Sequence, residues 1–69
     1  MEEKEKLISI VYGIADALMS TEDYYLIKQE IAIKRISHRI DSIINGSGFK
    51  LDINLIFSLV RETVETGQY

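Results

Sequence analysis

Histidine and a short row of basic residues are the groups in this sequence whose types could do chemistry or bind a charged ligand. His38 is the one histidine in the chain, and histidine is a residue type that often serves in acid–base chemistry. Asp41 follows it by three residues and Lys34 precedes it by four, so on a helix the three side chains share one side. General acid–base catalysis also needs a substrate pocket, which a helix surface does not supply by itself. We interpret His38 as a surface residue and predict no catalytic residue and no enzymatic activity.

The basic residues Lys28, Arg35 and Arg39 are seven and four positions apart, with Ala32 between them. On a helix they form one line, which we call the basic stripe. Such a line of cations can follow the phosphates of a nucleic acid. The sequence pI near 5.0 and the lack of aromatic residues along the stripe favour a solvated or acid-paired face instead. A nucleic-acid-binding regulator therefore stays as the alternative function, since a dimer would double the stripe.

The run Ser37-His38-Arg39-Ile40-Asp41 resembles the Ser-Gln-Glu-Leu-Asp signature of the small two-helix aspartyl-phosphate phosphatases of sporulating bacteria. Ser37 and Asp41 are identical and Ile40 is a conservative match, whereas His38 and Arg39 reverse the local charge. The resemblance covers five residues and is not a family assignment. It implies a second alternative, in which Ser37 and Asp41 face the phosphoaspartate of a response regulator.

Length and composition limit the remaining possibilities. The chain has 69 residues, which is room for a single domain over 1–69, and its net charge is −3. It has no cysteine, and no acidic cluster surrounds the histidine, so we predict no disulfide, no metal and no cofactor. A core in a chain below about 70–80 residues rarely contributes more than about 3–5 kcal/mol, so oligomerisation is the remaining way to add stability. No apolar run approaches the roughly 18 residues of a membrane span, and we expect a cytoplasmic protein without membrane contact.

Three helices are predicted, at about 3–19, 21–45 and 52–66, which makes the fold class all-α with a small three-helix domain. The stretch 20–45 has no glycine or proline, and Ser20 with Asp23 resembles a helix N-cap. Asn45 and Gly46 supply a left-handed stop, and Asp52 supplies the N-cap of the next helix. The spacing of the isoleucines predicts that the buried face of the second helix consists of Ile33, Ile36, Ile40 and Ile43.

Some apolar residues exceed what the predicted inner faces need. They recur at helical spacing on the other side of the second helix and beside the inner face of the third, which favours a second contact surface. We predict that this self-association or partner surface consists of Tyr24, Ile27, Ile31, Leu55 and Leu59. The chain is therefore expected to form a helical-bundle homodimer. It would act as a small protein-interaction or regulatory module, an adaptor, an inhibitor or an antitoxin-like protein, on a protein partner whose identity the sequence does not give.

Overall fold

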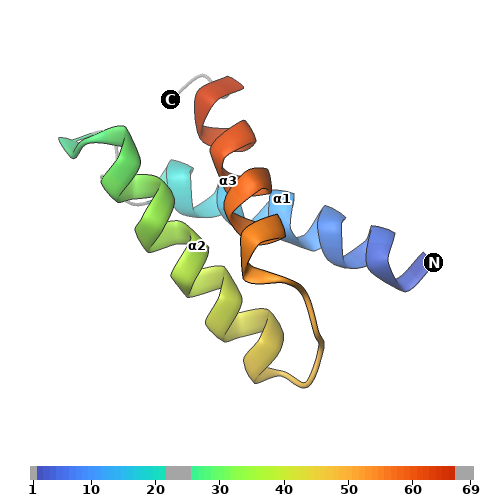
Figure 1. The fold of residues 1–69 in the computed structure, drawn as a ribbon. Helices are drawn as coiled ribbons and strands as arrows, with labels where there is room; N and C mark the ends of the chain where they lie inside the picture. The colour runs from blue at the N-terminus through green and yellow to red at the C-terminus, as the bar shows by residue number, and fades with distance from the viewer. Residues whose placement is uncertain (1, 22–25, 67–69) are drawn as a thin grey trace.

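Three α-helices make up the part of the chain that the structure describes, residues 2–21 and 26–66 of a computed structural model (Figure 1). They are α1 (Glu2–Thr21), α2 (Gln29–Gly46) and α3 (Ile53–Thr66). α2 and α3 form a hairpin, and α1 crosses it at a steep angle (Figure 1). This arrangement confirms the predicted all-α three-helix domain. None of the described helices is long and apolar enough to cross a membrane.

The core is a cluster of aliphatic side chains between the three helices. α2 contributes Ile33, Ile36, Ile40 and Ile44, each at most 3% exposed. Their spacing of three and four residues keeps them on one side of the helix. The other helices and the α2–α3 connection complete the cluster with Leu7, Val11, Ala15, Met19, Leu51, Ile56, Leu59 and Val60.

The predicted buried face of α2 is right at three positions and wrong at the fourth. Ile33, Ile36 and Ile40 are buried, but Ile43 is 46% exposed. Ile44 takes the core position instead and is 3% exposed. Consecutive residues on a helix differ by about 100° in direction, so Ile43 and Ile44 face different ways, and here Ile44 is the one that faces the core.

The predicted start of the second helix is wrong by about eight residues. α1 continues through Ser20, the predicted N-cap, to Thr21, whose hydroxyl donates to the carbonyl of Ala17 at 2.8 Å. α2 begins at Gln29, after Lys28 in an extended conformation (φ −62°, ψ 144°). The separation of the two helices is confirmed, and Asp23 and Tyr24, which belonged to the predicted cap, lie outside the described residues.

The end of α2 is a glycine-terminated cap: the helix ends one residue later than predicted, and the left-handed glycine is Gly48 instead of Gly46. Gly46 is still helical, and Gly48 holds the left-handed conformation with φ +96°. The N–H of Gly48 donates to the carbonyl of Asn45, and the N–H of Phe49 to that of Ile44, both at 3.3 Å. This pair of bonds is the Schellman motif, in which the residue after the glycine returns to the helix. The next predicted cap is confirmed, because Asp52 Oδ1 accepts the N–H of Asn54 at 3.3 Å.

Two polar contacts tie the helices together at the surface. The guanidinium of Arg61 on α3 donates to both carboxylate oxygens of Glu30 on α2, at 2.7 and 3.1 Å. These hydrogen bonds and the positive charge lower the pKa of Glu30 below its ordinary value of 4.5. The hydroxyl of Tyr12 on α1 donates to Glu62 Oε1 on α3 at 2.5 Å, and this bond raises the pKa of Tyr12. Each contact joins helices far apart in the sequence.

Replacing Ile40 by alanine is expected to lower the free energy of unfolding by about 2–5 kcal/mol, because it leaves a cavity at a fully buried position. Ile43→Ala removes the same atoms from a half-exposed position and should cost less than about 1 kcal/mol. Urea unfolding followed by circular dichroism measures both. Equal costs for the two variants would contradict the assignment of Ile44, rather than Ile43, to the core.

The Glu30–Arg61 pair should stabilise the protein at neutral pH and not in acid. Because the folded-state pKa of Glu30 is lowered, its contribution is present above the ordinary carboxylate pKa and is lost as the pH falls through the folded value. A double-mutant cycle of Glu30→Gln and Arg61→Gln isolates the pair from the nearby Glu65, which lies 3.6 Å from Arg61. The coupling should be measurable at neutral pH and should disappear as the pH is lowered below the folded-state pKa of Glu30. A coupling that does not change with pH would show that the pair is not an ion pair in solution.

Candidate interaction surfaces

Apolar side chains remain exposed although the core is closed. In the described part of the chain, six large hydrophobic side chains are more than a third exposed. Isolated exposed apolar residues are ordinary, but grouped ones mark contact surfaces. Leu26 and Ile31 lie near the start of α2, and Ile10, Ile43 and Phe49 lie near its end. The sixth, Tyr12, is hydrogen-bonded to Glu62. In chain order they are Ile10 47%, Tyr12 37%, Leu26 67%, Ile31 42%, Ile43 46% and Phe49 46%.

The group near the end of α2 encloses a small cleft of about 100 Å³ between α1, α2 and the turn after α2. Two of its lining residues, Leu7 and Ile44, are buried. Three others, Ile10, Ile43 and Phe49, have side chains that are nearly half exposed. We call this site the apolar cleft. It is lined by Leu7, Ile10, Ile43, Ile44, Ser47 and Phe49.

Phe49 reaches the apolar cleft because the turn after α2 is held at several points. The Schellman cap returns the Phe49 backbone to Ile44, a fellow lining residue. The amide side chain of Asn45 then holds Leu51, accepting its N–H at 2.9 Å and donating to its carbonyl at 3.2 Å. The same amide nitrogen donates to Asp41 Oδ1 at 2.5 Å. The turn is thus fixed on both sides of Phe49.

Sequence reasoning missed the apolar cleft. It assigned Ile43 to the core, whereas Ile43 and Phe49 are each 46% exposed. Ile10 is three residues from both Leu7 and Gly13, at the edge of a broad apolar face of the first helix. The helical spacing of the apolar residues therefore does not predict whether Ile10 is buried or exposed. The available signal was the aromatic residue directly after the Gly46–Gly48 pair, where a Schellman cap brings it to the helix end.

The four described residues of the predicted self-association surface do not form one surface. Ile31 is 42% exposed, whereas Ile27 and Leu55 are partly buried against the core and Leu59 is 8% exposed within it. Tyr24 lies outside the described residues. Leu55 and Ile31 are also at opposite ends of the hairpin, since Leu55 comes shortly after the α2–α3 connection and Ile31 is in the first turn of α2. The exposed part of this prediction is Ile31, which Leu26 joins as a residue that the sequence did not single out.

The basic stripe is exposed along its whole length. Lys28, Arg35 and Arg39 are all exposed, but Ala32 between them is buried, so the stripe borders the core. The acids of α2, Glu30 and Asp41, bond Arg61 of α3 and Asn45 respectively. The stripe therefore runs along the side of α2 away from those acids.

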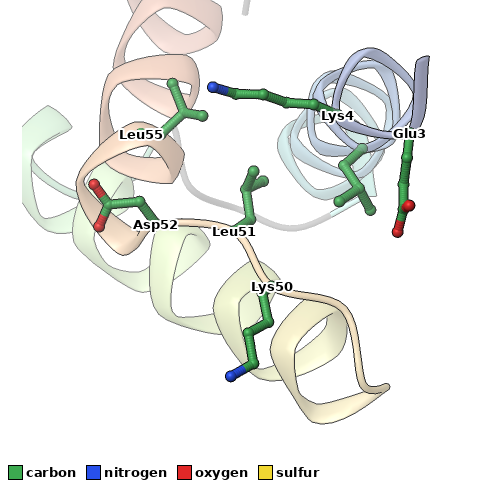
Figure 2. Close-up of a pocket in the computed structure, with 7 residues that line it drawn as sticks. Glu3, Lys4, Lys50, Leu51, Asp52 and Leu55 are labelled. Carbon is green, nitrogen blue, oxygen red and sulfur yellow. The ribbon is translucent and has the colours of Figure 1, made fainter. Parts of the chain in front are cut away.

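A second, larger hollow of about 430 Å³ separates the start of α1 from the start of α3 (Figure 2). Figure 2 shows the Lys4 side chain reaching from α1 toward Leu55, while Lys50 points away from the hollow. Its lining mixes two lysines, two carboxylates and leucines but includes no histidine, cysteine or hydroxyl group that could act as a nucleophile. The lining residues are Glu3, Lys4, Leu7, Lys50, Leu51, Asp52 and Leu55.

The residues considered for catalysis are not brought into a site. Ser37 is fully buried, and its hydroxyl has no hydrogen-bond partner among the described residues. A second protein therefore cannot contact Ser37, and Asp41 is engaged by Asn45. His38 is exposed and lies edge-to-face against Phe57, with ring centroids 5.7 Å apart. In the described part of the chain, no three His, Cys, Asp or Glu side chains are close enough to hold a metal ion.

Replacing Asn45 by alanine should loosen the turn that carries Phe49. The substitution leaves the part-buried N–H and carbonyl of Leu51 without partners, which should lower the free energy of unfolding by about 1–3 kcal/mol. Amide hydrogen exchange should also become faster at residues 46–51. Ser47→Ala is the matched control, because its hydroxyl bonds only the Ile43 carbonyl within the helix. Equal exchange rates in the two variants would show that Asn45 does not hold the turn.

Comparison with known proteins finds no matching family model, no similar curated protein and no matching solved structure. The function must therefore be argued from the surfaces of this chain alone.

Proposed function

We propose that this chain is a small cytoplasmic protein-interaction or regulatory module, of adaptor, inhibitor or antitoxin-like type, which binds another protein and assembles as a homodimer. The observation that carries the proposal is the grouping of large apolar side chains outside a closed core. A domain of 69 residues gains little stability from such groups unless another chain covers them.

The homodimer is proposed to form through the start of α2. Leu26 is 67% exposed and Ile31 is 42% exposed, and both lie beside the partly buried Ile27. In a two-fold dimer this patch meets its own copy, so each substitution acts twice. The patch leaves the apolar cleft, twelve residues further along α2 at Ile43, open for a different protein.

Ile31→Glu is expected to shift the protein from dimer to monomer, because it brings two unpaired carboxylates into an apolar interface. Light scattering over a concentration series measures the change in mass, and the melting temperature of the parent should rise with concentration. Asn54→Glu, the same change in charge at an exposed position of α3, is the control and should leave the mass unchanged. A parent that is monomeric at high concentration would refute the homodimer.

The alternative function, a nucleic-acid-binding regulator, keeps one supporting observation, the exposure of the whole basic stripe. Binding of a labelled DNA duplex over a salt series separates the two functions, because a basic face that binds an acidic protein would also retain heparin. Binding that falls steeply with salt, and falls further in Arg35→Glu, would favour nucleic acid. A protein-binding module should show no more than weak binding of the duplex.

A further inference from the structure

The apolar cleft and the basic stripe are parts of one continuous face. Arg35, Arg39, Ile43 and Ser47 occur at intervals of four residues, so they lie in one row along α2. The row begins with cations and ends at two residues that line the apolar cleft. At about 1.5 Å per residue it is about 18 Å long, which is the length of about three helical turns.

The surroundings of this face are more basic than acidic, although the whole chain is acidic. Lys6 precedes Ile10 of the apolar cleft by one turn, and Lys50 comes directly after Phe49. Glu3 is an acid on the same helix as Ile10, seven residues earlier. Glu30 and Asp41, the acids of α2, bond Arg61 and Asn45 and lie away from the basic stripe. A ligand on this face would therefore gain from an apolar end and a negatively charged end.

We propose that this face binds an amphipathic helix of a partner protein, with apolar side chains in the apolar cleft and acidic side chains along the basic stripe. Helix-in-groove recognition places apolar anchors at positions i, i+3 or i+4 of the bound helix, and a three-turn helix matches the length of the row. Charge complementarity along the stripe then fixes the direction of the bound helix and excludes basic helices. This inference rests on the proposed protein-binding function and names the kind of partner.

A second copy of the chain fits this face less well. The apolar side chains of α3 are all buried or partly buried, so α3 of a folded copy presents no free apolar row to this face. A nucleic acid would neutralise the cations but would leave Ile10 and Ile43 uncovered. The combination of the apolar cleft with the basic stripe favours a protein helix that carries both apolar and acidic side chains.

The test uses the full chain and a fluorescein-labelled peptide of about 14 residues, long enough for the row of about 18 Å. The peptide carries leucines at one helical face toward one end and glutamates on the same face toward the other. A matched peptide replaces each glutamate by lysine and keeps the leucines. Fluorescence anisotropy should show that the glutamate peptide binds at least about tenfold more tightly than the lysine peptide. Equal binding of the two peptides, or no binding of either, would overturn the proposal.

Variants of the chain locate the bound peptide. Ile43→Ser and Arg35→Glu should each weaken binding of the glutamate peptide by about tenfold or more. Lys34→Glu changes the charge by the same amount as Arg35→Glu but lies outside the row, and it should leave binding unchanged. Because all three side chains are exposed, the fold should survive, which circular dichroism checks. Loss of binding in Lys34→Glu as large as in Arg35→Glu would reduce the effect to net charge and overturn the proposal.

The outcomes separate this inference from the homodimer and from nucleic-acid binding. Ile31→Ser should weaken self-association without changing peptide binding, and Ile43→Ser should do the reverse. If the protein is a dimer but does not bind the glutamate peptide, the proposed function stands and this inference is refuted. A short DNA duplex whose binding is lost in Arg35→Glu but unchanged in Ile43→Ser, with no peptide binding, would assign the face to nucleic acid and also refute it.

Discussion

Burial of one side of α2 is the constraint on which the rest of the structure depends. Ile33, Ile36, Ile40 and Ile44 are at most 3% exposed, and both neighbouring helices contribute their apolar residues to the same cluster. A chain of this length can build one such cluster and no more, because a small domain buries a limited share of its surface. The polar contacts between helices, Glu30 with Arg61 and Tyr12 with Glu62, lie at the exposed border of the cluster. Exposed pairs of this kind contribute little free energy compared with apolar burial, so they specify how the helices are placed more than they hold them together.

The same constraint explains why contact surfaces remain. α1 and α3 cover part of the circumference of α2, so apolar residues just outside that arc stay in solvent. Ile43 is one step beyond Ile44 on the helix and is left exposed, next to Ile10 and Phe49. Ile31 is left exposed at the other end of α2. The exposed apolar groups are thus the margins of the core, and Ile31 and Ile43 lie twelve residues apart along α2.

The turn between α2 and α3 connects the fold to the apolar cleft. Gly48 allows the left-handed conformation that ends α2, and the hydrogen bonds of Phe49 and Asn45 fix the path of the chain from Gly48 to Leu51. An exposed aromatic side chain on an unrestrained loop would lose conformational freedom on binding, and that entropy loss would weaken association. A fixed Phe49 is already ordered. The polar groups that hold the turn therefore belong to the recognition surface as much as Phe49 itself does.

The sequence by itself determined the number of helices, the inner residues Ile33, Ile36 and Ile40, the N-cap at Asp52 and the exposure of the basic stripe. These features are local, because they depend on helical periodicity and capping chemistry along one segment. The tertiary structure decided which residues beside the row of inner isoleucines are buried by the adjacent helices, Ile44 and not Ile43. Periodicity places residues on a common face but does not say how wide an arc the adjacent helices cover, and it therefore predicted burial for Ile43 and exposure for Leu59. The same limit applies to Ser37, which is polar in sequence and fully buried in the fold. The apolar cleft joins residues from two helices and a turn, so it exists only where those elements cross.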